Sequence, residues 1–179
     1  HADEDIWYGL GDFDSMSEVK ESSVAAGAEV KFAADRMLGR LAKWLRVLGC
    51  DVIYGPHLSG YGLIRAARAE QRLILTRDRR LKQKQPPAFI FIESDHHREQ
   101  LRQVIRECGV EFANRLFSRC LECNTLLQVR PKESVEQLVP AYVFATQKYF
   151  SWCSRCRRVY WPATHQQKMA EELKKIDIR

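Results

Sequence analysis

The residues with the clearest chemistry are four cysteines arranged in two Cys-x-x-Cys pairs. Cys120 and Cys123 form the first pair, and Cys153 and Cys156 form the second, with 29 residues between the pairs. Four thiolates at such spacings bind Zn²⁺ tetrahedrally, and a shell filled by protein ligands leaves no position for a reactive water. The sequence therefore predicts a structural zinc site in a ribbon whose two metal-binding loops are joined by strands.

A second set of candidate ligands consists of carboxylates that each stand just after a short apolar run. Asp35 and Asp78 follow two such runs, and Glu93 and Asp95 follow another. Converging carboxylates suit Mg²⁺ or Mn²⁺, which can activate water for phosphodiester cleavage. Each acid taken alone is equally explained as the cap of the helix that follows it, where Asp is favoured. For Asp35 and Asp78 together, we favour the metal-site interpretation.

Short apolar runs alternate with amphipathic segments along the middle of the chain. The pattern predicts strands at 30–34, 51–54, 73–75 and 88–92, and helices at about 37–48, 61–70 and 97–108, with one or two helical turns after Asp78. Leucines and an alanine at 38, 41, 42, 45 and 48 form the expected buried stripe of the first helix. Alternating strands and helices indicate an α/β fold with a parallel sheet, whose functional crevice lies beyond the carboxyl ends of the strands.

The charge of the chain is divided unevenly between its N-terminal segment and the remainder. The net charge is +6, yet residues 1–30 contain eight acids and one base, which leaves 28 basic and 15 acidic residues beyond. Such a cationic surface favours polyanions and makes their binding dependent on salt. The alternative is a solvated surface without a ligand. We expect nucleic acid to be the partner.

Basic and aromatic residues also surround the second cysteine pair. Arg155, Arg157, Arg158 and Trp161 could neutralise phosphates and stack on bases. The alternative is that the aromatic residues form a small core over the metal. Only the arginines favour RNA over this structural interpretation.

Several classes of protein do not fit this sequence. It contains no run of eighteen apolar residues and no secretory signal, so neither a membrane protein nor a secreted protein is expected. The cysteine spacing points to metal binding in an intracellular protein, cytoplasmic or nuclear, with Cys50 and Cys108 as small buried hydrophobic residues. Residues 1–29 are expected to be an acidic tail or linker, and the absence of an initiator Met suggests a piece of a longer protein.

Particular stretches of the chain resemble the Mut-seven C-terminal RNase domain family. They are residues 31–46 (KFAADRMLGRLAKWLR), 48–51 (LGCD), 75–78 (LTRD), 119–124 (RCLECN), 153–161 (CSRCRRVYW) and 164–165 (TH). The resemblance covers about residues 30 to 170. It implies a PIN-like nuclease domain over 30–112 and a zinc ribbon with a C-terminal helix over 113–179. The resemblance also implies that, in animals, such a domain follows the exonuclease domain in the sequence of Nibbler-like enzymes, which trim the 3′ ends of small RNAs.

The resemblance also places the metal-binding acids of a PIN-like site at Asp35 and Asp78, where Mg²⁺ or Mn²⁺ would bind. Relatives usually have further acids in the loop that enters the second helix, whereas residues 57–63 (HLSGYGL) contain none. Arg36 replaces the usual small residue after the first acid, and Arg80 closely follows the second. These changes weaken a cation site and improve a surface for phosphates.

Three hypotheses follow for the function of the chain. The preferred one is a weakly catalytic or inactive domain that binds single-stranded RNA in a Nibbler-like 3′–5′ exoribonuclease. The second is an active metal-dependent endoribonuclease, and the third is a scaffold that recruits a protein of the RNA-silencing machinery. The residues expected to contact RNA are Arg36, Arg40, Lys43, Arg77, Arg79, Arg80, Arg155, Arg157, Arg158 and Trp161.

Overall fold

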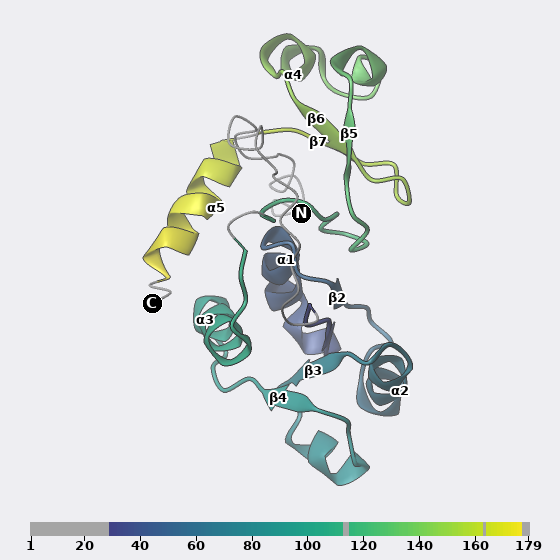
Figure 1. The fold of residues 1–179 in the computed structure, drawn as a ribbon, viewed down its shortest axis with the longest axis vertical. Coiled ribbons are helices and arrows are strands. Elements are labelled where there is room, and N and C mark those ends of the chain that lie inside the picture. The colour runs from purple at the N-terminus through teal and green to yellow at the C-terminus, as the bar shows by residue number, and fades with distance from the viewer. Residues whose placement is uncertain (1–28, 113–114, 163, 177–179) are drawn as a thin grey trace. The chain divides into compact units, whose positions relative to one another are not determined.

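The structure is a computed structural model that describes residues 29–112, 115–162 and 164–176 (Figure 1). The chain divides into two compact units, and their described parts are residues 29–124 and 125–176. The first unit continues past the domain boundary that the sequence predicts at residue 112 and includes the first cysteine pair. The predicted acidic tail at 1–29 lies almost wholly outside the described residues.

The first unit is built on a four-stranded parallel sheet in the order β2-β1-β3-β4. Its strands are β1 (Phe32–Ala34), β2 (Val52–Ile53), β3 (Leu73–Thr76) and β4 (Phe89–Phe91). Its helices are α1 (Gly39–Val47), α2 (Gly60–Glu70) and α3 (His97–Cys108), with 3-10 turns η3 (Arg36–Leu38) and η4 (Arg79–Lys84). The predicted α/β fold with a parallel sheet flanked by helices is therefore confirmed.

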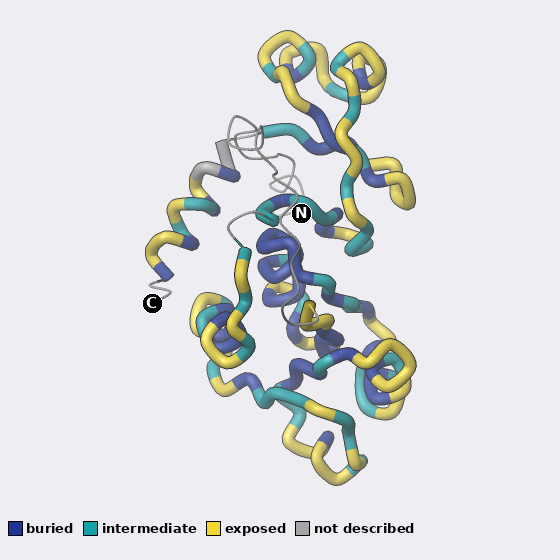
Figure 2. Tube along the Cα trace, viewed as in Figure 1, coloured by how far each residue is buried: buried dark blue, intermediate teal, exposed yellow. Residues whose placement is uncertain are grey.

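The core of this unit follows the apolar pattern of the sequence. All five residues of the predicted stripe on the first helix are buried, and so is every residue of β1. A second cluster, formed by Ala33, Leu58, Leu63, Ile64, Ala67, Ile74 and Leu81, packs α2 and η4 against the sheet. Figure 2 shows the resulting pattern, in which β1 and most of β3 are buried, β4 is of intermediate burial, and the outer helix faces are exposed.

The strand order determines where a site can form. After β1, the chain forms β2 on one side and later returns to form β3 on the other side of β1. The carboxyl ends of β1 and β3 are therefore neighbours at the point where the direction of winding reverses. In open parallel sheets, ligands bind at this point. Asp35 directly follows β1, and Asp78 comes two residues after β3.

The second unit contains a three-stranded antiparallel sheet in the order β5-β6-β7. Its elements are β5 (Gln128–Arg130), β6 (Phe150–Trp152), β7 (Val159–Tyr160), η5 (Lys132–Val135), α4 (Ala141–Thr146) and α5 (Thr164–Lys175), the last being the predicted C-terminal helix. Its core is small and is formed by Val135, Val143, Phe150 and Val159. Within the described residues, no helix is both long and apolar enough to cross a bilayer.

Candidate metal centre and nuclease-like site

The four cysteines of the two pairs come together. The Sγ atoms of Cys120, Cys123, Cys153 and Cys156 all lie within 4.8 Å of one another. A tetrahedral ion with Zn–S bonds of about 2.3 Å has its sulfurs about 3.8 Å apart, which lies within this limit. The cluster predicted from the spacing is confirmed, and its donor set fits a metal ion such as Zn²⁺.

The backbone of the two cysteine loops has the same geometry. The Asn124 N–H donates to the Cys120 carbonyl at 2.9 Å, and the Arg157 N–H donates to the Cys153 carbonyl at 2.8 Å. Asn124 and Arg157 each follow a second cysteine and have φ of 71° and 59°. This left-handed backbone is tolerated by Asn but is unfavourable for Arg. Both Cys-x-x-Cys loops therefore close with the same backbone turn.

Asp35 lies at the carboxyl end of β1 with only 1 % of its surface exposed. Its Oδ2 atom accepts a hydrogen bond from the Thr76 hydroxyl at 2.8 Å. Its Oδ1 atom is also buried, and no donor among the described residues bonds to it. Although Asp35 occupies the cap position of η3, its side chain does not cap that turn. Burial of a carboxylate oxygen without a donor is costly, which is typical of a site that holds a ligand.

Asp78 has a different environment, in which its carboxylate is already engaged. Its Oδ1 atom accepts from the backbone N–H of Arg80 at 3.0 Å and lies 3.4 Å from Nε of the same residue. The Arg80 backbone bond, together with the Arg80 side chain, lowers the pKa of Asp78. The capping alternative is therefore observed for Asp78, whereas it is not observed for Asp35.

Thr76 connects the two acids and was not recognised from the sequence. Its buried hydroxyl donates to the Asp35 carboxylate and accepts from the Asp78 backbone N–H at 3.0 Å. This threonine thereby fixes the orientation of Asp35 and the start of the loop that carries Asp78. A threonine at the end of a buried strand, just before the acid, is the local signal that could have suggested this role.

The remaining carboxylates do not complete a cation site. Glu93 and Asp95 are exposed on the loop after β4. Within the described part of the chain, the four cysteines are the one group of three or more potential ligands close enough to share an ion. Because Mg²⁺ is usually bound by one or two carboxylates and keeps several waters, Asp35 and Asp78 stay the candidate ligands at this end of the sheet.

The basic residues predicted to contact RNA in the first unit fall into two groups. Arg36, Arg40, Arg79 and Arg80 are exposed, and Arg80 has 83 % of its side chain exposed. By contrast, Arg77 donates to the Ile92 and Glu93 carbonyls at 2.9 and 2.7 Å, and Lys43 lies 3.5 Å from Glu122. Arg77 thus joins the ends of β3 and β4, which is a structural role.

A shallow hollow of about 300 Å³ lies at the carboxyl end of β4. It is lined by Arg79, Lys82, Phe91 and Glu93, and the Arg79 guanidinium stands 5.8 Å from the centre of the Phe91 ring. Gln103 fixes the backbone beside it by bonding to the Phe91 carbonyl at 2.8 Å and the Glu93 N–H at 3.0 Å. Cations beside a partly exposed ring are suited to a nucleotide.

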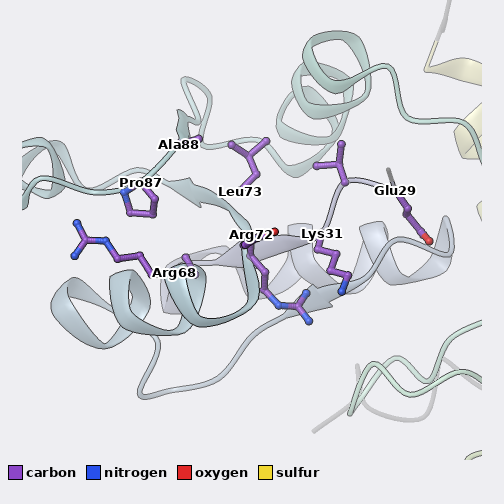
Figure 3. A pocket seen from close by; sticks show the side chains of 10 residues that line it. Glu29, Lys31, Arg68, Arg72, Leu73, Pro87 and Ala88 are labelled. Carbon is purple, nitrogen blue, oxygen red and sulfur yellow. The ribbon is translucent and has the colours of Figure 1, made fainter. Parts of the chain in front are cut away.

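A larger cavity of about 520 Å³ lies where the amino ends of β1, β3 and β4 meet (Figure 3). Lys31, Arg68 and Arg72 contribute basic groups to its lining, together with apolar residues that include Leu73 and Ala88. The amino ends of the strands lie at the opposite edge of the sheet from Asp35 and Asp78. This cavity is therefore a second basic surface of the same unit, at the opposite end of the strands from the two acids.

In the second unit, the predicted RNA-binding residues have different surroundings. Arg155, Arg157 and Arg158 are exposed. Trp152 lies 4.1 Å from the Arg130 guanidinium and 6.0 Å from that of Arg157, measured to its ring centre. Trp161 is partly exposed and packs against the small core of this unit, and its contact with RNA stays a prediction.

The two cysteines outside the four-cysteine cluster have thiols whose pKa is raised by burial. Cys50 is buried, and burial raises its thiol pKa to about 12. Cys108 is partly buried, and burial raises its pKa to about 11. Both pKa values agree with the prediction that these residues pack as small hydrophobic side chains.

The fold and the side-chain geometry together define a class: an α/β domain with two acids after neighbouring strands, and a four-cysteine cluster of the kind found in zinc ribbons. The chain belongs to the family of Mut7-C RNAse domains, whose family model matches residues 30–173. This match confirms the resemblance seen in the sequence and indicates an RNA-related, nuclease-like domain. No curated protein and no solved structure matches the chain.

Proposed function

We propose that this chain is an RNA-binding accessory domain of a Nibbler-like 3′–5′ exoribonuclease that trims small RNAs inside the cell, in the cytoplasm or the nucleus. Its own nuclease-like site is degraded. The observation that carries this proposal is the pairing of Asp78 with both the backbone and the side chain of Arg80. A carboxylate held in this way by a cation is a poor ligand for a divalent ion.

The charges around this edge of the sheet favour phosphate over metal. Arg36 and Arg79 are exposed beside the two acids in the sequence, and Lys82 joins Arg79 in the hollow next to Phe91. A base that stacks on an aromatic ring must first leave a duplex, so single-stranded RNA is the expected ligand. The same surface would hold the RNA while the exonuclease of the parent protein removes its 3′ nucleotides.

Zinc is the proposed ion of the cysteine cluster, where it has a structural role. Cys120, Cys123, Cys153 and Cys156 would hold it, and their four thiolates leave no position for a substrate. The small core of residues 125–176 needs such a support, because few apolar side chains are buried there. Freshly purified, unchelated protein should contain close to one zinc per chain. A content far below one would refute this part of the proposal.

The test of the RNA function is incubation of the purified chain with a labelled single-stranded small RNA. The reaction is run with Mg²⁺, with Mn²⁺ and with a chelator, and both retention and product length are followed. Binding without shortening is the expected result. The double variant Asp35→Asn with Asp78→Asn serves as the control for contaminating nuclease, because contaminating cleavage persists in it.

An active endoribonuclease is the second candidate, and one observation favours it. The buried Oδ1 atom of Asp35 has no donor among the described residues, as expected for an oxygen that faces an ion. Metal-dependent cleavage that disappears in both Asp35→Asn and Asp78→Asn would establish this alternative. A third role, recruitment of a silencing protein through the ribbon, would be supported by partner capture that survives charge reversal of Arg155, Arg157 and Arg158.

A further inference from the structure

One buried arginine connects the first cysteine loop to the α/β sheet. Arg46 extends from α1 and has only 3 % of its surface exposed. Its Nη1 atom donates to the carbonyls of Leu121 and Glu122, the two residues between the cysteines, at 2.8 and 3.1 Å. Its Nε and Nη2 atoms donate to the Val52 carbonyl of β2 at 3.1 and 2.9 Å. A single guanidinium therefore holds the first cysteine loop against β2, the outer strand of the sheet.

The residue that ends this loop makes a second connection to the same strand. The Asn124 side chain accepts from the Val52 N–H at 3.0 Å and donates to the Asp51 carboxylate at 2.7 Å. Its carbonyl accepts from the Arg119 guanidinium at 2.9 Å, and Arg119 also donates to the Gly49 carbonyl at 3.0 Å. The loop is thus anchored both between its cysteines and immediately after them.

These bonds continue into the buried part of the sheet. Asp51 forms an ion pair with Arg72 at 2.7 Å, and the Arg72 side chain has 6 % of its surface exposed. Arg72 also donates to the Phe32 carbonyl of β1 at 3.2 Å. The conformation of the first cysteine loop is therefore coupled to β1 and β2 through charge-assisted hydrogen bonds, which are stronger than neutral ones.

We propose that the α/β unit preforms the first half of the metal centre. Arg46 and Asn124 are positioning residues that hold Cys120 and Cys123 in their metal-binding conformation before the ion arrives. The inference rests on the proposed binding of zinc. Because a preformed loop loses less conformational freedom on binding, these two side chains raise the affinity for the metal. By linkage, the bound metal stabilises the β2 edge of the sheet in return.

The two cysteine loops provide a matched pair of variants that tests this idea. Asn124→Gly and Arg157→Gly each place glycine at a left-handed position after the second cysteine, so the backbone conformation is retained in both. Only Asn124→Gly removes bonds to Val52 and Asp51. Affinity is measured on the full chain by Co²⁺ titration, followed by Zn²⁺ competition. Asn124→Gly should bind about 10 to 100 times more weakly than the wild type, and Arg157→Gly within about threefold.

A second pair of variants tests Arg46 without removing its charge. Arg46→Lys retains the cation but cannot reach both sets of carbonyls, whereas Arg106→Lys makes the same change at an exposed position of α3. Hydrogen exchange at the Val52 amide is followed with and without Zn²⁺. Zinc should slow this exchange in the wild type at least tenfold more than in Arg46→Lys, whereas Arg106→Lys should behave as the wild type.

The possible failures of the two proposals differ. If the wild type binds neither Co²⁺ nor Zn²⁺, the metal centre itself is refuted. If the wild type binds zinc while Asn124→Gly and Arg157→Gly bind it equally well, the preformed half-site is refuted and the metal centre stands. Protection of the Val52 amide that does not depend on zinc would also overturn the coupling.

Discussion

The proposed binding of RNA at the carboxyl ends of the strands leads to a quantitative prediction for two basic residues. Arg79 and Lys82 are exposed cations in the hollow beside Phe91, and each could contact one phosphate. For single-stranded nucleic acid, each phosphate contact adds about 0.7 to the slope of log K against log salt concentration. Substituting Ala for both should therefore lower the slope by about 1.4. At 0.15 M salt, the same counterion term weakens binding about tenfold.

The matched control changes the same charge at the opposite edge of the sheet. Lys31→Ala with Arg68→Ala removes one lysine and one arginine from the cavity at the amino ends of the strands (Figure 3). Fluorescence anisotropy of a labelled single-stranded RNA is measured for both double variants between 50 and 300 mM salt. The control should retain its affinity within about twofold. Equal losses in the two double variants would refute a localised site, because a diffuse cationic surface would then explain the binding.

Three further predictions concern buried charge and thiol chemistry. Asp35→Asn should raise the thermal midpoint by about 2–4 °C in chelator, measured calorimetrically, since it replaces a buried carboxylate whose Oδ1 atom has no donor among the described residues. A lower midpoint would contradict this. Burial raises the pKa of Asp51, but hydrogen bonds from Arg72 and Asn124 and the Arg72 charge outweigh it, so the pKa is lowered below 3.8. The stabilising contribution of the Asp51 carboxylate should be complete above its ordinary pKa of 3.8 and should be lost as the pH falls through its lower pKa in the folded protein. Arg72→Met should lower the free energy of unfolding in urea by about 3 kcal/mol at pH 7, and that free energy should then fall less steeply in acid. Cys50, with a pKa of about 12, should resist alkylation at pH 8 until the chain is unfolded, and rapid labelling of native protein would contradict its burial.

Local patterns in the sequence were sufficient for most elements of the α/β unit and for the four-cysteine cluster, but the strands and helices between residues 128 and 160 were not placed. The predicted helix at 97–108 has the bounds of α3, because its apolar period and its terminal Gly109 both act within a few residues. The strand predicted at 30–34 is shorter in the structure and spans Phe32–Ala34. Phe32 and Ala33 pair with both β2 and β3, and Ala34 pairs with β3. The cysteine pairs were recognised because metal ligation imposes its own spacing.

Other features depend on contacts between residues distant in the sequence, and these were not predicted. Arg46 bonds to Leu121 across 75 positions, and nothing near Arg46 in the sequence marks it as buried. Arg77 was expected to contact RNA, but its guanidinium is bound to carbonyls of the loop after β4. Trp161 is partly exposed and packs on the core of the second unit, and its proposed stacking on RNA stays a prediction. Composition identifies such residues as polar or aromatic, but only the fold determines whether they face solvent.

Metal-dependent cleavage and RNA binding have opposite electrostatic requirements at the carboxyl ends of β1 and β3, where Asp35 and Asp78 lie. A metal-dependent nuclease needs enough uncompensated negative charge to hold divalent ions, whereas RNA binding needs positive charge to neutralise phosphates. Here Arg80 binds the Asp78 carboxylate and offsets its negative charge. Among the described residues, the buried Thr76 hydroxyl is the one donor to the Asp35 carboxylate. Arg80→Ala removes the positive charge beside Asp78, so this variant should bind Mn²⁺ more strongly and RNA more weakly. If both were weakened or both strengthened, the antagonism between the two functions would not exist in this domain.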